Sequence, residues 1–264
     1  MDLQLRDRRA IVTGSTLGIG YAIAKGLAFE GASVILNGRT VEGVARAVAR
    51  LREQVPGGKI EGVVADVSLA EGAEALQAKA PTIDILVNNA GIFEPKNFFN
   101  ITDEEWRRFF SVNVLSGVRL ARLYARDMAA RKWGRILFVS SESAIAIPRE
   151  MIHYGVSKTA QLAVARGLAV EMAGTGVTVN SILPGPTRSE GVVEFIENLA
   201  TTTDRSVEEV EEDFFRTIRP TSLVRRFAEP DEVADLAVYL CSPRAAMTTG
   251  AAMRVDGGVV NAII

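Results

Sequence analysis

Seven short apolar runs recur along the 264-residue chain, and they constrain its fold more than any other feature. The runs are rich in Val and Ile, and segments with the apolar spacing of amphipathic helices separate most of them. They read AIVTG, ASVILN, IEGVVA, IDILVNN, RILFVS, VTVNSIL and AMRVDGG. Strands joined by crossover helices form a parallel sheet that is buried on both faces. The alternation therefore predicts an α/β fold, doubly wound around a seven-stranded parallel sheet with helices on both faces.

One segment, from about residue 187 to residue 226, interrupts this alternation. It contains VEEVEEDFFRTIRP, an acidic stretch in which Phe214 and Phe215 can pack inward, and we expect short helices there. An insertion of this length late in a fold is typical of a lid or binding loop. The chain has no Pro/Ser-rich linker and no repeat. We therefore predict a single domain over residues 1–264, with a substrate-binding lid at 187–226.

Charge and composition exclude several classes of function. The 30 basic and 32 acidic residues nearly balance, and no dense basic run is present, which argues against a nucleic-acid partner. No apolar stretch approaches the ~18 residues of a membrane span, and the charged first residues lack a signal-peptide core. The single cysteine, Cys241, has the setting of a buried helix end. We expect a soluble, cytoplasmic protein and assign no metal site.

A glycine-rich turn follows the first apolar run. The stretch TGSTLGIG places Gly14, Gly18 and Gly20 directly before a helical pattern. Its spacing differs from the commonest dinucleotide fingerprint, but a strand–turn–helix of this kind can aim backbone N–H groups at a pyrophosphate. A turn that merely joins a strand to a helix would look similar, so the glycines alone leave both interpretations open.

A tyrosine and a lysine form a second pattern. Tyr154 and Lys158 stand four residues apart in a helical segment and so share one face. A nearby ammonium lowers the pKa of a phenol, which would let Tyr154 exchange a proton with an alcohol or carbonyl. An unrelated surface pair is the alternative for this motif taken alone. Ser141 ends another apolar run, and the carboxyl ends of parallel strands are where such folds collect ligands.

Taken together, these motifs resemble the short-chain dehydrogenase/reductase family over nearly the whole chain. The resemblance rests on TGSTLGIG, NNAG (88–91), SVN ending at Asn113, Ser141, YGVSK (154–158), PGPT (184–187) and VDGG. It implies a single-domain Rossmann fold with sheet order 3-2-1-4-5-6-7 and a nicotinamide cofactor bound across it. It also implies a homotetramer, or failing that a dimer, because helices near 102–129 and 154–173 pair across a two-fold axis in the family.

The family resemblance also implies residue roles. Tyr154 would be the general acid or base, Ser141 would hydrogen-bond the reacting oxygen, and Lys158 would bind ribose hydroxyls and lower the pKa of Tyr154. Asn113 would hold a water that extends the proton relay. The implied cofactor contacts are Gly14, Ser15, Gly18, Ile19, Gly20, Arg39, Asp66, Val67, Asn89, Ala90, Gly91, Tyr154, Lys158, Pro184, Gly185 and Thr187. A strand-end cap for Asn89 and a turn role for Asp66 stay open as alternatives.

The end of the second apolar run bears on the choice of cofactor. Gly38 stands where an acidic residue would hold the adenosine ribose 2'-hydroxyl, and Arg39 follows it. A guanidinium can make charge-assisted contacts with a 2'-phosphate, which predicts NADP(H), with NAD(H) still possible. A solvated Arg39 is the alternative, since Leu17 stands where NADP-users of the family often carry a second basic residue.

The predicted function is the transfer of a hydride between NADP(H) and a small carbonyl or alcohol substrate, with ketone reduction the favoured direction. The alternatives are an NAD-dependent alcohol dehydrogenase of the same family, a non-catalytic cofactor-sensing regulator, and dehydration or epimerisation chemistry. The intact set of Asn113, Ser141, Tyr154 and Lys158 argues against a regulator. Other chemistry would need added acid or base groups, and we interpret Glu142 and His153 as pocket wall or local packing.

Overall fold

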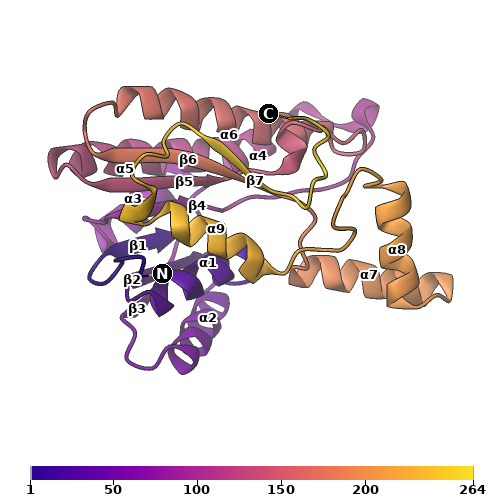
Figure 1. Cartoon of the computed structure of the whole chain (residues 1–264), viewed down its shortest axis with the longest axis horizontal. Helices are drawn as coiled ribbons and strands as arrows, with labels where there is room; N and C mark the ends of the chain where they lie inside the picture. Colours follow the sequence, from indigo (N-terminus) through magenta and orange to yellow (C-terminus); the bar gives the residue numbers. More distant parts are fainter. Residues whose placement is uncertain (1, 264) are drawn as a thin grey trace.

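The computed structural model describes residues 2–263, except for the side chain of residue 195. Its centre is a seven-stranded sheet in which all neighbours are parallel, in the order β3-β2-β1-β4-β5-β6-β7 (Figure 1). The strands are β1 (Arg9–Val12), β2 (Ser33–Gly38), β3 (Ile60–Val64), β4 (Ile85–Asn88), β5 (Gly134–Val139), β6 (Val177–Pro184) and β7 (Ala252–Val255). The predicted strand number and the order implied by the family resemblance are both confirmed.

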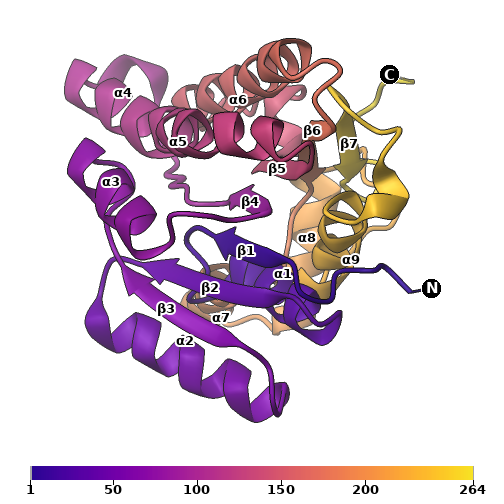
Figure 2. The ribbon, with the colours of Figure 1, turned by 90° about the vertical axis from the view of Figure 1, so that its left-hand side faces the viewer.

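Helices cover both faces of the sheet (Figure 2). One face packs against α1 (Gly18–Phe29), α2 (Val41–Gln54) and α9 (Pro230–Leu240). The other packs against α3 (Ala70–Lys79), α5 (Ser116–Ala130) and α6 (Ile152–Glu171). Three short 3-10 turns complete the connections: η1 (Phe98–Asn100), η3 (Glu142–Ala144) and η4 (Pro243–Ala245). The predicted doubly wound α/β fold is confirmed.

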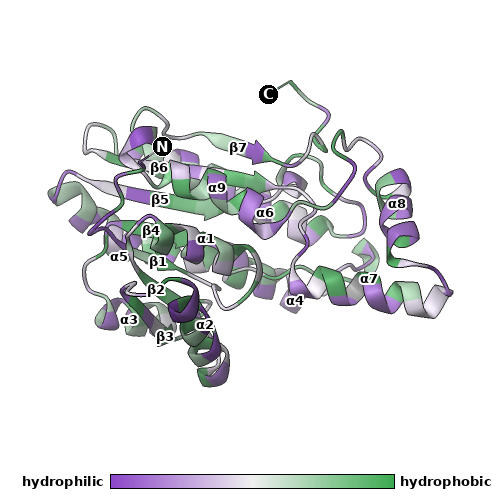
Figure 3. Cartoon of the chain, turned by 60° about the horizontal axis from the view of Figure 1, so that its bottom comes forward, coloured by the Kyte–Doolittle hydropathy of each residue, from purple (hydrophilic) through white to green (hydrophobic). Residues whose placement is uncertain are grey.

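The strands are apolar on both sides because both faces of the sheet are covered. In β1, Val12 lies in the core beneath α1 while its neighbour Ile11 lies in the core of the opposite face. Both side chains are fully buried. Hydrophobic colour accordingly runs along most of the central strands in Figure 3. This is why the sequence shows continuous apolar runs rather than the alternating pattern of a half-exposed sheet.

The position of the functional site follows from the strand order. The chain moves outward from β1 through β2 to β3, and then returns to the other side of β1 as β4. The connections after β1 and β4 therefore diverge to opposite faces and leave a crevice at the carboxyl edge of the sheet. The glycine-rich turn and the segment after β4 both open onto this edge.

The helical connection from β4 to β5 has an irregular middle. Helix α4 (Asp103–Phe109) begins with a capping box made by Thr102 and Glu105. It continues through a π-helical turn, η2 (Phe110–Leu115), into α5. Such turns are rare and occur frequently at functional sites. This one contains Asn113, which it places in the buried layer above the sheet.

The predicted interruption of the fold forms two helices, α7 (Glu190–Thr203) and α8 (Val207–Thr217), which project from one end of the molecule (Figure 1). They enclose a separate small apolar cluster, in which Phe215 is buried and Phe214 partly buried, as the paired phenylalanines suggested. The two ends of this excursion lie side by side. Arg188 N donates to Ala228 O at 2.8 Å, and Ala228 N donates to Pro186 O at 2.9 Å. Among residues 2–263, no helix is both long and apolar enough to cross a membrane.

Candidate active site

The four predicted catalytic side chains come from three elements and meet at the carboxyl edge of the sheet. Ser141 follows β5, Tyr154 and Lys158 lie in the first turns of α6, and Asn113 lies in η2. Gly91, just after β4, packs between two of them. A Cβ added at Gly91 would lie 3.4 Å from both Asn113 Oδ1 and Lys158 Nζ. The structure therefore brings together four residues that lie up to 45 positions apart in the sequence, at 113, 141, 154 and 158.

Lys158 is held inside the site rather than at the surface. Its Nζ donates a hydrogen bond to Val139 O at 2.9 Å and lies 5.6 Å from the centre of the Tyr154 ring. Only 4% of the residue is exposed, and this burial lowers the pKa of the ammonium to about 8. Lys158 thus carries its charge at neutral pH and loses it slightly above.

Tyr154 is partly buried, and this burial raises the pKa of its phenol. A hydrogen bond with Ser141 acts in the opposite direction, and the Glu142 carboxylate raises the pKa further. The sequence argument expected Lys158 to lower this pKa. In the structure, removal of the phenol from water outweighs the Ser141 hydrogen bond and the charge of Arg219, which both lower the pKa. Tyr154 therefore keeps its proton at neutral pH, which suits a proton donor.

Asn113 is fully buried, and its side chain fixes the segment after β4. Its Oδ1 accepts from Ile92 N at 2.8 Å, and its Nδ2 donates to Ile92 O at 3.0 Å. The same Nδ2 donates to Ser157 Oγ at 2.9 Å, and Gln161 Nε2 donates to the Asn113 carbonyl. Sequence reasoning missed Ser157 and Gln161. They lie three and seven residues after Tyr154, so helical spacing could have placed them on the same face.

The glycine-rich turn has the geometry of an anion cradle. Gly14 and Gly18 both adopt φ of +58°, a left-handed conformation that favours glycine. Within the described residues, no side chain caps the N-terminus of α1, so its first N–H groups are available to a ligand. Ile19 and Gly20 form the first turn of this helix. The residues present thus fit a pyrophosphate at this position.

Asn89 supports this turn from the neighbouring strand. Its Nδ2 donates to Thr13 O at 2.9 Å and to Gly14 O at 3.0 Å. Thr13 Oγ1 in turn accepts from the N–H groups of Asn89 and Ala90, both at 3.0 Å. A Cβ added at Gly20 would collide with Asn89 Nδ2 and lie 2.5 Å from Gly14 O. The side chain of Asn89 therefore ties the end of β4 to the glycine turn.

Three other predicted cofactor contacts face inward in this conformation, and two of them make internal hydrogen bonds. Ser15 is fully buried, and its hydroxyl donates to Val12 O at 2.6 Å while accepting from Asn37 N at 3.0 Å. Ser15 thus links the glycine-rich turn to the ends of β1 and β2. Asp66 forms the local turn considered for it, accepting from Ser68 N at 3.0 Å and Ser68 Oγ at 2.7 Å. Val67 is 5% exposed, so little of it can face a ligand.

The end of β2 explains why glycine stands at position 38. A Cβ there would lie 2.6 Å from Thr16 Cγ2 and 3.1 Å from Val44 Cγ2. An acidic side chain at this position would therefore displace Thr16. The next residue, Arg39, is exposed beside the N-terminus of α2, where Thr40 caps the helix. The Arg39 side chain is thus exposed and accessible to a ligand at this edge of the sheet.

The PGPT motif forms the opposite wall of the crevice, at the end of β6. Pro184 is the last residue of β6, and a Cβ added at Gly185 would lie 2.7 Å from Asp256 Cα. Thr187 is 7% exposed, and its hydroxyl donates to Gly185 O at 2.9 Å. The close approach at Gly185 lets the chain turn directly from the sheet into the helical excursion.

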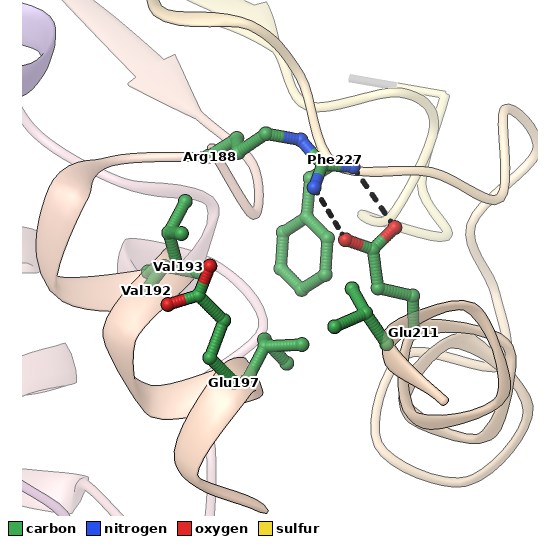
Figure 4. Close-up of a pocket in the computed structure, with 8 residues that line it drawn as sticks. Arg188, Val192, Val193, Glu197, Glu211 and Phe227 are labelled. Carbon is green, nitrogen blue, oxygen red and sulfur yellow. Dashed lines mark hydrogen bonds and ion pairs between the residues drawn. The ribbon is translucent and has the colours of Figure 1, made fainter. Parts of the chain in front are cut away.

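An arginine clamp holds the two helices of this excursion. Figure 4 shows Arg188 beside Phe227 with both of its terminal nitrogens on the Glu211 carboxylate, at 2.5 and 2.9 Å. Below them lies a cavity of about 70 Å³, lined mainly by apolar side chains of α7 and α8. This cavity lies within the excursion and contains none of the four predicted catalytic residues. The clamp links Arg188, just before α7, to α8, beside the apolar cluster that the two helices share.

Two residues beside the catalytic group were interpreted as packing. His153 fits that interpretation: it is 1% exposed, its ring lies 3.9 Å from that of Phe109, and burial lowers its pKa. Glu142 does not merely pack. Its Oε2 accepts from Ser141 Oγ at 2.5 Å, and its Oε1 accepts from Arg219 Nε at 3.2 Å. No local pattern could have revealed this contact, because Glu142 and Arg219 are 77 residues apart.

Comparisons with known proteins agree with this arrangement. A family model described as enoyl-(acyl carrier protein) reductase matches residues 14–260. The oxidoreductase YvaG of Bacillus subtilis is 45% identical over the full length of both chains. The 3-oxoacyl-[acyl-carrier-protein] reductase FabG of Aquifex aeolicus is 33% identical, over 98% of this chain and 100% of its own. The solved structure of L-sorbose reductase from Gluconobacter frateurii, complexed with NADPH and L-sorbose, is 32% identical, covers 100% of both chains and has a TM-score of 0.94. The chain belongs to the short-chain dehydrogenase/reductase family of oxidoreductases.

Proposed function

We propose that this protein is an NADP(H)-dependent reductase that converts a ketone to a secondary alcohol. The observation that carries the proposal is the placement of the protonated Tyr154 phenol beside the Ser141 hydroxyl, with Lys158 buried behind them. Two hydroxyl groups so placed can both reach one substrate oxygen. Tyr154 acts as general acid, because its phenol carries its proton at neutral pH.

The residues present fit a nicotinamide dinucleotide, which when bound supplies the hydride that reduces the carbonyl carbon. Tyr154 donates a proton to the carbonyl oxygen, and Ser141 stabilises the charge that develops there. Lys158 binds ribose hydroxyls, and Asn113 keeps the segment around Ile92 in place beside it. The glycine turn holds the pyrophosphate, and Gly91 leaves room at the centre of the crevice. L-sorbose reductase was solved with NADPH, and a Beutenbergia cavernae protein described as an NAD(P)-dependent gluconate 5-dehydrogenase was solved with bound NADP, which supports this choice of cofactor.

The proposal is tested by following the absorbance of NADPH with a panel of ketones, ketoacyl thioesters, sugars and steroids. We expect oxidation of NADPH that depends on one class of carbonyl. A protein that binds NADPH but turns over none of these carbonyls would instead be the cofactor-sensing regulator. Turnover without net oxidation of NADPH would indicate dehydration or epimerisation.

We predict that Arg39 sets the preference for NADP(H). Charge-assisted contacts with a 2'-phosphate contribute about 1.5–3 kcal/mol of binding free energy. This corresponds to a roughly ten- to hundredfold preference for NADPH over NADH. Arg39→Leu should lower kcat/KM for NADPH by about this factor and leave kcat/KM for NADH unchanged. Steady-state kinetics with both cofactors measure it, with Arg126→Leu, an exposed arginine on α5, as control. Equal kcat/KM for the two cofactors in the unmodified protein would contradict the assignment.

We predict that NADPH binding weakens as the pH rises through about 8, the pKa of Lys158. This pKa is depressed, so the ammonium is fully charged well below pH 8 and loses its charge above it, which weakens its hydrogen bonds to ribose. Titration calorimetry at pH values from roughly two units below this pKa to about 1.5 units above it would show the decline in affinity for NADPH. Lys158→Arg should remove the pH dependence because arginine keeps its charge. A flat profile in the unmodified protein would show that the charge of Lys158 does not contribute.

We propose that the segment 187–226 is a lid. In its present position, α7 places the Glu190 carboxylate 3.6 Å from the Cβ that Gly18 would carry, next to the predicted pyrophosphate cradle. A carboxylate beside this cradle would repel a bound pyrophosphate, and we propose that the start of α7 moves away together with Glu190 when the dinucleotide binds. Hydrogen exchange should be faster over residues 189–219 than in the central strands, and slower once NADPH is added. Exchange equally slow in both regions without ligand would contradict a lid.

We also propose a cytoplasmic homotetramer. Apolar side chains that would suit an interface are exposed at Leu115 and Val170, on the η2 turn and α6, and at Ile263 near the C-terminus. The free, buried Cys241 is compatible with a reducing compartment.

A further inference from the structure

The hydroxyl of Ser141 is already engaged in this structure. Its single proton is donated to Glu142 Oε2 at 2.5 Å. Ser143 N also donates to the same carboxylate oxygen, at 2.9 Å, and to Ser141 Oγ, at 3.1 Å. Serine has one O–H donor, so this bond and a bond to a substrate oxygen exclude each other. The reaction proposed above therefore requires Glu142 to give up its bond from Ser141.

Glu142 is held so that it cannot turn away to water. Its side chain is 6% exposed, and Arg219 holds its other oxygen at 3.2 Å. Arg219 belongs to the turn after α8 and is itself only 13% exposed, with Glu150 at 3.6 Å on its other side. Both Glu142 and Arg219 act electrostatically on the phenol of Tyr154. The carboxylate is thus fixed beside both hydroxyl groups that face the reacting oxygen.

Redirecting the Ser141 hydrogen bond from Glu142 to a substrate has a free-energy cost that depends on the substrate. A plain ketone accepts the hydrogen bond but leaves Glu142 Oε2 with one donor fewer in a buried position. Unsatisfied buried acceptors are costly, more so when they are charged. A substrate that brings its own hydroxyl can donate to Oε2 and restore the lost bond.

We propose that Glu142 is a specificity-determining residue that selects carbonyl substrates with a hydroxyl group on the neighbouring carbon. This inference rests on the proposed reductase function. Ser141 Oγ and Glu142 Oε2 are only 2.5 Å apart, so the two substrate oxygens that contact them must also be close together. A hydroxyl on the neighbouring carbon meets this condition with the fewest rotatable bonds to fix, so it loses the least conformational entropy. A substrate carboxylate at this point would be repelled by Glu142. Arg219 positions Glu142 from the lid segment, which links substrate recognition to the closure of that segment.

The test compares three ketones of one carbon skeleton, each reduced with NADPH: the plain ketone, its α-hydroxy derivative and its β-hydroxy isomer. We expect kcat/KM for the α-hydroxy ketone to exceed that for the other two by about ten- to hundredfold, the range for a hydrogen bond to a charged group. In Glu142→Gln, this ratio should shrink toward one because the amide is an uncharged and weaker acceptor. Each ratio is measured within one preparation, so a smaller fraction of folded protein does not change it.

Glu150→Gln is the matched control, because Glu150 also faces Arg219 and does not contact Ser141. It should keep the wild-type ratio. Equal kcat/KM for the α-hydroxy ketone and the plain ketone in the unmodified protein would overturn this inference and leave the reductase function standing. Retention of the full preference in Glu142→Gln would also overturn it. The absence of NADPH oxidation with all three ketones, repeated on larger skeletons, would overturn the reductase function itself and this inference with it.

Discussion

Replacement of Tyr154 by phenylalanine should lower kcat for carbonyl reduction by about a hundred- to ten-thousandfold, the usual contribution of a general acid. The substitution removes the phenolic O–H and leaves the ring, whose edge contact with Phe93 has a centroid separation of 6.3 Å. The affinity for NADPH should stay close to that of the unmodified protein, because the change removes only the transferable proton. Steady-state kinetics and calorimetric titration with NADPH measure the two quantities separately.

Tyr239→Phe is the matched control for this substitution. Tyr239 lies on α9, away from the site, and is 37% exposed, so loss of its hydroxyl should leave kcat unchanged. If Tyr154→Phe retained a kcat near that of the unmodified protein, another group would have to supply the proton.

Gly20→Ala should weaken NADPH binding by about ten- to a hundredfold or more, because an added methyl in this tight turn forces a shift that typically costs about 1–3 kcal/mol. The new Cβ would collide with Asn89 Nδ2 and would lie 2.5 Å from Gly14 O. These are the two groups whose hydrogen bond ties β4 to the glycine turn. The loss should appear both in the Kd for NADPH and in Tm, because the same shift strains the folded protein.

The comparison for this variant is Gly191→Ala. Gly191 lies in the first turn of α7, and a Cβ there has no atom within 4 Å. Alanine favours a helix by about 1 kcal/mol over glycine, so this variant should raise Tm slightly or leave it unchanged. Unaltered NADPH affinity in Gly20→Ala would mean that the turn can relax without loss of its N–H geometry, against the role proposed for Gly20.

The fold was predictable because its cause is local. A buried parallel strand is apolar on both sides, so a run such as RILFVS marks one directly. The spacing of Tyr154 and Lys158 likewise fixes their common face as soon as the segment is helical. The family resemblance then supplied the partners Ser141 and Asn113, which lie in other elements and which no local rule connects.

Other properties of the site depend on distances that the sequence does not contain. The pKa of Tyr154 depends mainly on how far the phenol is buried from water, which its sequence separation from Lys158 does not reveal. The contact of Glu142 with Arg219 joins a residue of η3 to one of the lid segment. Steric limits are equally hidden: from the sequence, the absence of a carboxylate at Gly38 is a matter of cofactor charge, yet any side chain there would also have to displace Thr16.

The adjacent ends of the helical excursion have an evolutionary consequence. Residues 187 and 228 are bridged to each other, so the chain leaves the sheet and returns at one point. Whatever lies between them closes the same small gap, and the entropy of closure depends only weakly on its length. The excursion also has its own apolar cluster, so its residues can change without repacking the two sheet cores. Substrate range can therefore diverge by exchange of this one module, while Ser141, Tyr154 and Lys158 stay fixed on the sheet and α6.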